Sequence, residues 1–207
     1  MLKRTTVKMS FTIKKCRVTL DFLFLAMVTV MLLGDRGGIA QIAILSAALH
    51  ESGHLAVMYA YGVEPLQIRF TPFGIDIVKS CCVNRSYQRD TLISLAGSSV
   101  NLIAAFLFYL LYHSVTHPFF IINCTLAGFN LLPIEPLDGG QALYSALCMR
   151  VSTDLAAKIV SICSFAVLVP FALFGFSLLF RSPGNYYMLI VCFYLIFLLV
   201  FKSGRYY

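Results

Sequence analysis

The apolar segment 39–61 contains the polar motif His50-Glu51-Ser52-Gly53-His54, and this combination constrains the fold more than any other feature of the sequence. Three residues of the motif, His50, Glu51 and His54, are the only side chains in the segment that can carry a charge near neutral pH. Ionisable groups at membrane depth are costly and usually mark a functional site. On a helix, the two histidines lie one turn apart on one face, where both can bind one zinc ion. The motif therefore predicts a helical metal site with Glu51 as general base.

The rest of the chain predicts a polytopic membrane protein. Its 207 residues are 59% hydrophobic and 12% charged, whereas a soluble domain is typically about 25% charged. We expect a single domain over residues 1–207 that is all-α apart from one small β-hairpin, with about six transmembrane helices and no regulatory soluble domain. The predicted spans are residues 18–33, 39–61, 91–112, 118–134, 155–180 and 186–201.

The basic residues are distributed unevenly across this six-span arrangement. Fourteen of the 16 Lys and Arg residues fall on one side, including those of the basic N-terminus 1–17, and only Arg36 and Arg181 fall on the other. Because cytoplasmic loops carry the excess of Lys and Arg, we expect both termini to be cytosolic. The basic residues flank apolar segments and form no patch with interleaved aromatics, so no nucleic-acid partner is expected.

The loop between the second and third predicted spans has an alternating pattern. Residues 66–71 and 75–79 alternate around Pro72-Phe73-Gly74, which predicts a membrane-associated β-hairpin. The alternative is an irregular amphipathic loop on the membrane surface. The seven cysteines form no disulfide framework, because they lie in apolar segments or in basic segments that we expect to be cytosolic.

A third metal ligand must come from elsewhere in the chain, because a catalytic zinc usually has three protein ligands and one water. His113 and His117 are expected on the opposite side of the membrane. Two carboxylates, Glu135 and Asp138, lie in the segment 130–140, where prolines and glycines open the backbone at the cytosolic end of the fourth predicted span. Either could complete the site, and the alternative is a loop that only ends a span.

Two motifs together carry a family resemblance. The sequence Asn-x-x-Pro-x-x-Pro-x-Asp-Gly-Gly at 130–140, after a membrane His-Glu-x-x-His, resembles the site-2 protease family of intramembrane zinc metalloproteases, and most closely the branch of stage IV sporulation protein FB. Residues 71–74 (Thr-Pro-Phe-Gly) resemble a Pro-Phe-Gly element of that branch's hairpin. Residues 97–101 (Gly-Ser-Ser-Val-Asn) resemble a Gly-Pro-x-x-Asn element of a core helix, with Ser98 standing where the family has proline.

The resemblance implies a function for several residues. It implies that His50, His54 and Asp138 bind one Zn²⁺ per chain and that Glu51 is the catalytic acid and base. It also implies that Asn130 and Pro136 line a substrate cleft that Asn101 faces. Separately from the resemblance, we hypothesise that Asn130 or Asn101 donates a hydrogen bond to the oxyanion.

The resemblance further implies a metalloendopeptidase in the lipid bilayer of the bacterial cytoplasmic membrane. Its substrates would be membrane-spanning or membrane-associated proteins cut near the cytosolic face, and the hairpin would pair with the unwound substrate. Within the resembling branch, the analogy is regulated proteolysis of a transcription-factor precursor in sporulation, under a possible regulatory membrane partner.

Three alternatives stay open. The first is a membrane metalloprotease of another type, with Glu135 or Glu64 as third ligand. The second is a membrane hydroxylase or desaturase, which needs more histidines for two irons than the four in this chain. The third is a catalytically inactive scaffold of the same fold, which would have no need of Glu51.

Overall fold

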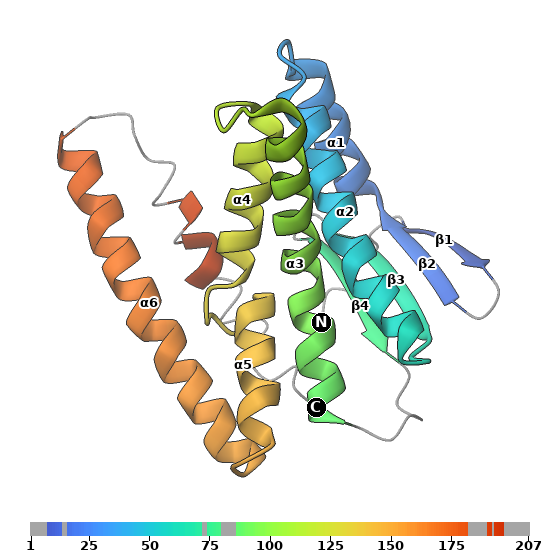
Figure 1. Ribbon diagram of the computed structural model, residues 1–207, viewed down its shortest axis with the longest axis vertical. Coiled ribbons are helices and arrows are strands. Elements are labelled where there is room, and N and C mark those ends of the chain that lie inside the picture. The colour runs from blue at the N-terminus through green and yellow to red at the C-terminus, as the bar shows by residue number, and fades with distance from the viewer. Residues whose placement is uncertain are drawn as a thin grey trace, which may run out of the picture. The chain divides into compact units, whose positions relative to one another are not determined.

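A computed structural model describes residues 8–13, 16–71, 74–79, 86–181, 190–191 and 193–196 of the chain (Figure 1). In chain order, its strands and helices are β1 (Lys8–Ile13), β2 (Cys16–Asp21), α1 (Phe22–Gly34), α2 (Ile39–Ala60), β3 (Pro65–Thr71), β4 (Gly74–Lys79), α3 (Tyr87–Tyr112), α4 (Pro118–Asn130), α5 (Asp138–Cys148) and α6 (Thr153–Arg181). Most of the predicted span 186–201 lies outside the described residues. Contacts divide the chain into two compact units, residues Met1–Arg85 with Ser99–Leu126 and residues Ser86–Ser98 with Ala127–Tyr207.

The first unit contains a four-stranded sheet in the order β1-β2-β3-β4. β1 and β2 pair antiparallel, β2 and β3 pair parallel, and β3 and β4 pair antiparallel. The last pair confirms the predicted hairpin, although Pro72 and Phe73 of its turn lie outside the described residues. Gly74 begins β4 at a φ of 126°, a conformation that favours glycine. The side chain of Thr71 donates a hydrogen bond to the Gly74 carbonyl across the turn.

The N-terminal strands correct two sequence-based expectations. Residues 1–17 were expected to be a basic terminus before a span at 18–33, but β1 and β2 occupy 8–13 and 16–21, and α1 starts only at Phe22. In β2, apolar Val18 and Leu20 alternate with polar neighbours, which is a strand period rather than a helix period. Because these residues join directly onto an apolar helix, the two patterns merge in the sequence. The fold is mostly helical with a four-stranded sheet, larger than the single hairpin expected.

A short capped turn connects α1 to α2. The carboxylate of Asp35 accepts hydrogen bonds from the backbone N–H groups of Gly37, Ile39 and Ala40 at 3.1, 3.2 and 2.8 Å. The first N–H groups of a helix lack partners within the helix, so this carboxylate caps the start of α2. Gly38 precedes the helix with a φ of 72°, a conformation that glycine adopts readily because it has no Cβ.

Among the described residues, two helices are long and apolar enough to cross a membrane, Tyr87–Tyr112 and Thr153–Ser177. The apolar helices Phe22–Gly34 and Pro118–Asn130 are shorter, at 13 residues each. α2 has 22 residues, but the polar motif at its centre lowers its hydropathy. The two long helices fit membrane insertion, and six spans are not confirmed.

In the second unit, α4 ends at Asn130, four residues before the predicted end at residue 134, and residues 131–137 form a turn that contains the two prolines. α5 then begins at Asp138, a separate helix that the apolar pattern did not predict. The turn is anchored by Ile134 and Leu137, which pack in an apolar cluster with Leu168 of α6. A second cluster joins α5 to α6 through buried residues, Tyr144, Ala156 and Val160.

Candidate metal centre

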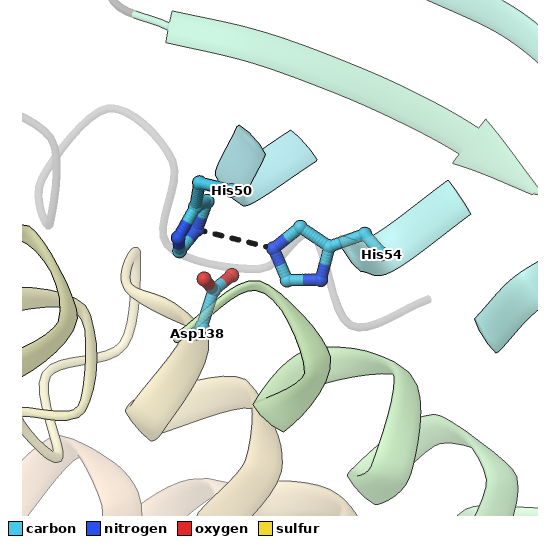
Figure 2. A group of neighbouring side chains, drawn as sticks. All are labelled: His50, His54 and Asp138. Carbon is cyan, nitrogen blue, oxygen red and sulfur yellow. Dashed lines mark hydrogen bonds between the residues drawn. The ribbon is translucent and has the colours of Figure 1, made fainter. Parts of the chain in front are cut away.

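The two histidines of the motif lie on the buried face of α2. His50 and His54 are 6% and 8% exposed, and other buried residues of the same helix include Ser46 and Met58 at helical spacing. The Nε2 atoms of the two imidazoles lie 3.2 Å apart, and the rings meet edge to face at an interplanar angle of 80°. Figure 2 shows this contact as a dashed line. Both rings therefore direct the same nitrogen toward one point.

This spacing fits zinc. Two nitrogens bound to one tetrahedral zinc, each about 2.0–2.1 Å from the metal, lie roughly 3.3 Å apart. The observed 3.2 Å between the Nε2 atoms of His50 and His54 agrees with that separation. The two imidazoles therefore already have the arrangement of two ligands to one ion.

Behind His50 lies a group of buried polar side chains from three helices. The Nδ1 atom of His50 lies 2.7 Å from Oδ1 of Asn101 on α3. The amide nitrogen of Asn101 donates to the Ser46 carbonyl at 3.0 Å and to Oδ1 of Asn123 on α4 at 2.7 Å. The amide nitrogen of Asn123 donates in turn to Oγ of Ser46 and to the Phe119 carbonyl, both at 2.9 Å. Hydrogen bonds thus join α2, α3 and α4 directly behind the first histidine.

Asp138 is the first residue of α5, and it is half-buried. Two glycines follow it, and both lie against the preceding turn. A Cβ at Gly139 would overlap the carbonyl oxygen of Leu131, and one at Gly140 would overlap the carbonyl oxygen of Ile134. The Asp-Gly-Gly sequence therefore allows the turn to pack closely over the first turn of α5, where an acidic residue also favours the helix dipole.

His50, His54 and Asp138 are a group that could hold a metal ion. Each offers one ligand atom, and these atoms all lie within 4.8 Å of one another (Figure 2). Two imidazole nitrogens with one carboxylate oxygen are a donor set that catalytic zinc sites use. Among the described residues, Glu135 is not part of this group.

The remaining candidate residues are placed as follows. Glu51 is half-buried on α2, between the two histidines in sequence. Asn130 ends α4, and Pro136 lies in the turn before α5; both are half-buried. Asn101 is fully buried, and its amide bonds to His50, Ser46 and Asn123. The cleft-lining roles of Asn130, Pro136 and Asn101 stay predictions.

Several buried polar residues were not singled out from the sequence, among them Ser46, Asn123 and Ser164. Asn123 is an amide within the apolar helix α4, and its polarity there was the available signal. Ser164 of α6 is also fully buried, and its hydroxyl accepts a hydrogen bond from the backbone N–H of Glu135. Serine is common in membrane helices, so nothing in the sequence distinguished Ser164 from its neighbours.

Comparison with known proteins gives matches in sequence and in structure. No family model matches the chain. A zinc metalloprotease of Methanocaldococcus jannaschii is 29% identical over 128 residues, which are 56% of this chain and 37% of that protein. Stage IV sporulation protein FB of Bacillus subtilis is 29% identical over 107 residues, which are 49% of this chain and 37% of that protein. The chain thus spans 37% of the length of each of these curated relatives.

Among solved structures, the site-2 protease from Methanocaldococcus jannaschii superposes with a TM-score of 0.64 at 22% identity. The superposition covers 93% of this chain and 92% of that chain, so the two share a fold. Together, the two sequence relatives and the shared fold confirm the predicted resemblance to the site-2 protease family.

Proposed function

We propose that this chain is an intramembrane zinc metalloendopeptidase that hydrolyses peptide bonds of membrane-spanning or membrane-associated proteins. The observation that carries the proposal is the pair of buried imidazoles on α2, whose Nε2 atoms lie 3.2 Å apart. Two buried histidines and a glutamate in an apolar helix cost free energy, so residues of this kind usually have a function. The names of the sequence relatives, one of which is a zinc metalloprotease, support the same activity.

In this proposal, His50, His54 and Asp138 hold one zinc ion per chain. The spacing of their ligand atoms and their mixed nitrogen and oxygen donor set support the assignment. When bound, zinc would polarise the scissile carbonyl and lower the pKa of a water molecule toward about 7.

Glu51 carries the proton transfers. Its carboxylate takes a proton from the attacking water and then delivers it to the leaving amine, as a general base and acid. Glu51 follows His50 directly on α2, so it lies within the same helical turn as the metal ligands. A half-buried position also protects the carboxylate from bulk water while keeping it accessible to a substrate.

The substrate binds as an extended segment, because a helical peptide bond is shielded by its own backbone. β4 is the terminal strand in the sheet order, and an edge strand can add an extended peptide by main-chain hydrogen bonds. Asn130 and Pro136 would line the cleft, whereas the fully buried Asn101 would lie behind His50. The turn between α4 and α5 is not helical and contains two prolines, Pro133 and Pro136, which supports a non-helical cleft wall there.

The proposed setting is the bacterial cytoplasmic membrane, with both termini cytosolic and cleavage near the cytosolic face. The excess of basic residues on one side of the predicted spans supports this orientation. The relative from Bacillus subtilis is named for sporulation, which makes a transcription-factor precursor a reasonable first class of substrate to test, with a regulatory membrane partner.

Zinc content separates this proposal from its alternatives. We would measure zinc by elemental analysis of detergent-purified protein for wild type, Asp138→Ala, Glu51→Gln and Glu135→Ala. Retained helical circular dichroism would show that each variant is folded. The proposal expects about one zinc per chain in wild type, Glu51→Gln and Glu135→Ala, and loss in Asp138→Ala.

Other outcomes assign the site differently. Loss of zinc in Glu135→Ala with retention in Asp138→Ala would make Glu135 the third ligand. No zinc in folded wild type would favour the scaffold, which has the same fold without the activity. Cleavage of a model membrane substrate by wild type, abolished in Glu51→Gln, would then separate an enzyme from a zinc-binding scaffold.

A further inference from the structure

We infer that Asn101 and Asn123 are positioning residues that hold His50 in a single tautomer, with the proton on Nδ1 and the lone pair on Nε2. The inference rests on the proposed function, because the lone pair matters only if His50 binds a metal. Neither asparagine is a metal ligand in this scheme. Their effect on the site passes through hydrogen bonds that start at a backbone carbonyl of α4 and end at the imidazole.

The orientation of Asn123 is fixed by an acceptor that cannot change its role. Its amide nitrogen lies 2.9 Å from the carbonyl oxygen of Phe119, and a carbonyl oxygen only accepts hydrogen bonds. The NH₂ group must therefore face Phe119. The carbonyl side of the Asn123 amide then faces Asn101, where it can only accept.

The same reasoning fixes Asn101. Its amide nitrogen donates to the Ser46 carbonyl at 3.0 Å and to Oδ1 of Asn123 at 2.7 Å, so both N–H bonds are used. Its Oδ1 therefore faces His50 and lies 2.7 Å from Nδ1. Because this oxygen carries no hydrogen, the proton between the two residues belongs to Nδ1 of His50. In a neutral imidazole, Nε2 is then the nitrogen with the lone pair.

Burial makes this arrangement stable. Asn101, Asn123 and Ser46 are all 0% exposed, and His50 is 6% exposed. Water does not compete for these donors and acceptors, and reversing one amide would place two N–H groups or two oxygens against each other. A fully satisfied buried network of this kind specifies one arrangement of its side chains. The tautomer of His50 is thus fixed in the metal-free protein.

The Nδ1–H tautomer of His50 is the one that metal binding through Nε2 requires. A metal-bound histidine usually donates its other N–H to a fixed acceptor, and loss of that acceptor typically lowers metal affinity about 10–100-fold. Here the acceptor is an amide oxygen rather than the more common carboxylate or backbone carbonyl. A buried amide adds no negative charge to the apolar interior and so needs no counterion. Asn123 matters because it holds the Asn101 amide in the required orientation.

The first test is the tautomer itself, in wild-type protein without metal. Histidine labelled with ¹⁵N distinguishes a protonated from an unprotonated ring nitrogen in a magnetic resonance spectrum, and comparison with His50→Gln assigns the signals of His50. The inference expects Nδ1 of His50 to be protonated and Nε2 to be unprotonated. Protonation of Nε2 instead would overturn it, and this test requires neither metal nor substrate.

The second test is zinc affinity, measured by competition with a chelator in detergent. Asn101→Leu removes the acceptor and is expected to bind zinc roughly 10–100-fold more weakly, and Asn123→Ala at least about threefold more weakly. Asn101→Asp keeps an oxygen opposite Nδ1 and is expected to restore most of the affinity, although a buried carboxylate costs stability. A purely structural role would instead make affinity follow stability across these variants.

Ser98→Ala is the matched control, because Ser98 is equally buried on α3 and its hydroxyl has no recorded partner. It is expected to bind zinc as wild type does. If wild type binds zinc but Asn101→Leu and Asn123→Ala bind equally well, the positioning role is overturned and the proposed function stands. If folded wild type binds no zinc, the proposed function fails, and the inference fails with it.

Discussion

The hydroxyl of Ser164 on α6 accepts a hydrogen bond from the backbone N–H of Glu135, with 2.9 Å between the two atoms. The same hydroxyl donates to the Val160 carbonyl one turn earlier, at 2.8 Å. α6 thus fixes the turn between α4 and α5, three residues before Asp138. The position of the predicted third ligand depends on this turn, since Asp138 begins the helix that follows it.

Replacing Ser164 with alanine should therefore destabilise the protein. The N–H of Glu135 would lose this acceptor in a partly buried position, and the net loss of such a hydrogen bond typically costs about 0.5–1.5 kcal/mol. We expect Ser164→Ala to lower the unfolding midpoint in a thermal or denaturant titration. Zinc affinity should fall as well, because the turn that precedes Asp138 is less well held.

Ser98→Ala is the comparison for this prediction. Both serines are fully buried, but Ser98 alone has a hydroxyl with no recorded partner. Removal of an unsatisfied buried hydroxyl should leave stability unchanged or raise it by up to about 1 kcal/mol. Equal losses of stability in Ser98→Ala and Ser164→Ala would show that the hydrogen bond to Glu135 does not account for the destabilisation.

The two glycines after Asp138 should not tolerate a side chain. A methyl group at Gly139 or Gly140 would overlap the backbone of the preceding turn, which cannot move as a flexible side chain would. We expect Gly139→Ala and Gly140→Ala each to cost about 1–3 kcal/mol or more and to reduce zinc occupancy. The measurements are a chemical unfolding curve and elemental analysis.

Gly128→Ala tests whether such losses come from close packing or only from changing a glycine. Gly128 lies in α4, and a Cβ there would meet no other heavy atom within 4 Å. Alanine favours a helix interior over glycine by up to about 1 kcal/mol. Gly128→Ala should thus be neutral or stabilising, and a loss as large as that of Gly139→Ala would contradict the packing argument.

Glu51→Gln should separate catalysis from metal binding. Glutamine keeps the size of the side chain but cannot act as a base, and general acid–base catalysis typically contributes about 10²–10⁴-fold in rate. We expect peptide hydrolysis to fall by at least that factor while zinc stays at the wild-type level. Substantial cleavage by a zinc-loaded Glu51→Gln would place the base elsewhere.

Asp35 should make the stability of the α1–α2 connection depend on pH. Desolvation tends to raise the pKa of its carboxyl, but hydrogen bonds from backbone N–H groups, chiefly those of Ala40, Gly37 and Ile39, outweigh it, so the pKa lies below the ordinary 3.8. A lowered pKa in the folded state stabilises at pH values above the unfolded pKa, and this contribution is lost as pH falls through the folded value. Thermal unfolding from pH 7 to pH 3 should show the loss in wild type.

Asp35→Asn should show a shallower acid dependence, because it carries no charge to lose. Asp154→Asn is a suitable control, since Asp154 is an exposed acidic residue in the first turn of α6. If Asp154→Asn flattens the pH dependence as much as Asp35→Asn does, the cap at α2 does not account for it.

The sequence predicted the parts of the fold that local pattern controls. α2 and α3 appear within a few residues of their predicted ends, and the hairpin of β3 and β4 forms where the alternation indicated. The break after Asn130 also follows from the prolines. In each case the signal lies within one element and does not depend on distant partners.

The sequence did not predict features that depend on pairing across the chain. β2 is stabilised by pairing with β3, which lies about 50 residues later in the chain. Its alternating pattern is short and continues directly into the apolar segment of α1, so the pattern alone did not predict a strand. At the site, the His50 and His54 pair follows from helical spacing alone. The contribution of Asn123 depends on three helices meeting, and no spacing rule places an asparagine of α4 near Ser46.

The parallel pairing of β2 with β3 joins the start of α1 to the end of α2. The two helices are therefore connected at both ends, by the Asp35 turn at one and by strand hydrogen bonds at the other. A register slip of two residues between these strands would displace the end of α2 relative to the start of α1 by about 7 Å, more than the pitch of an α-helix. The register of β2 and β3 thus contributes to the position of the His-Glu-x-x-His motif relative to α1.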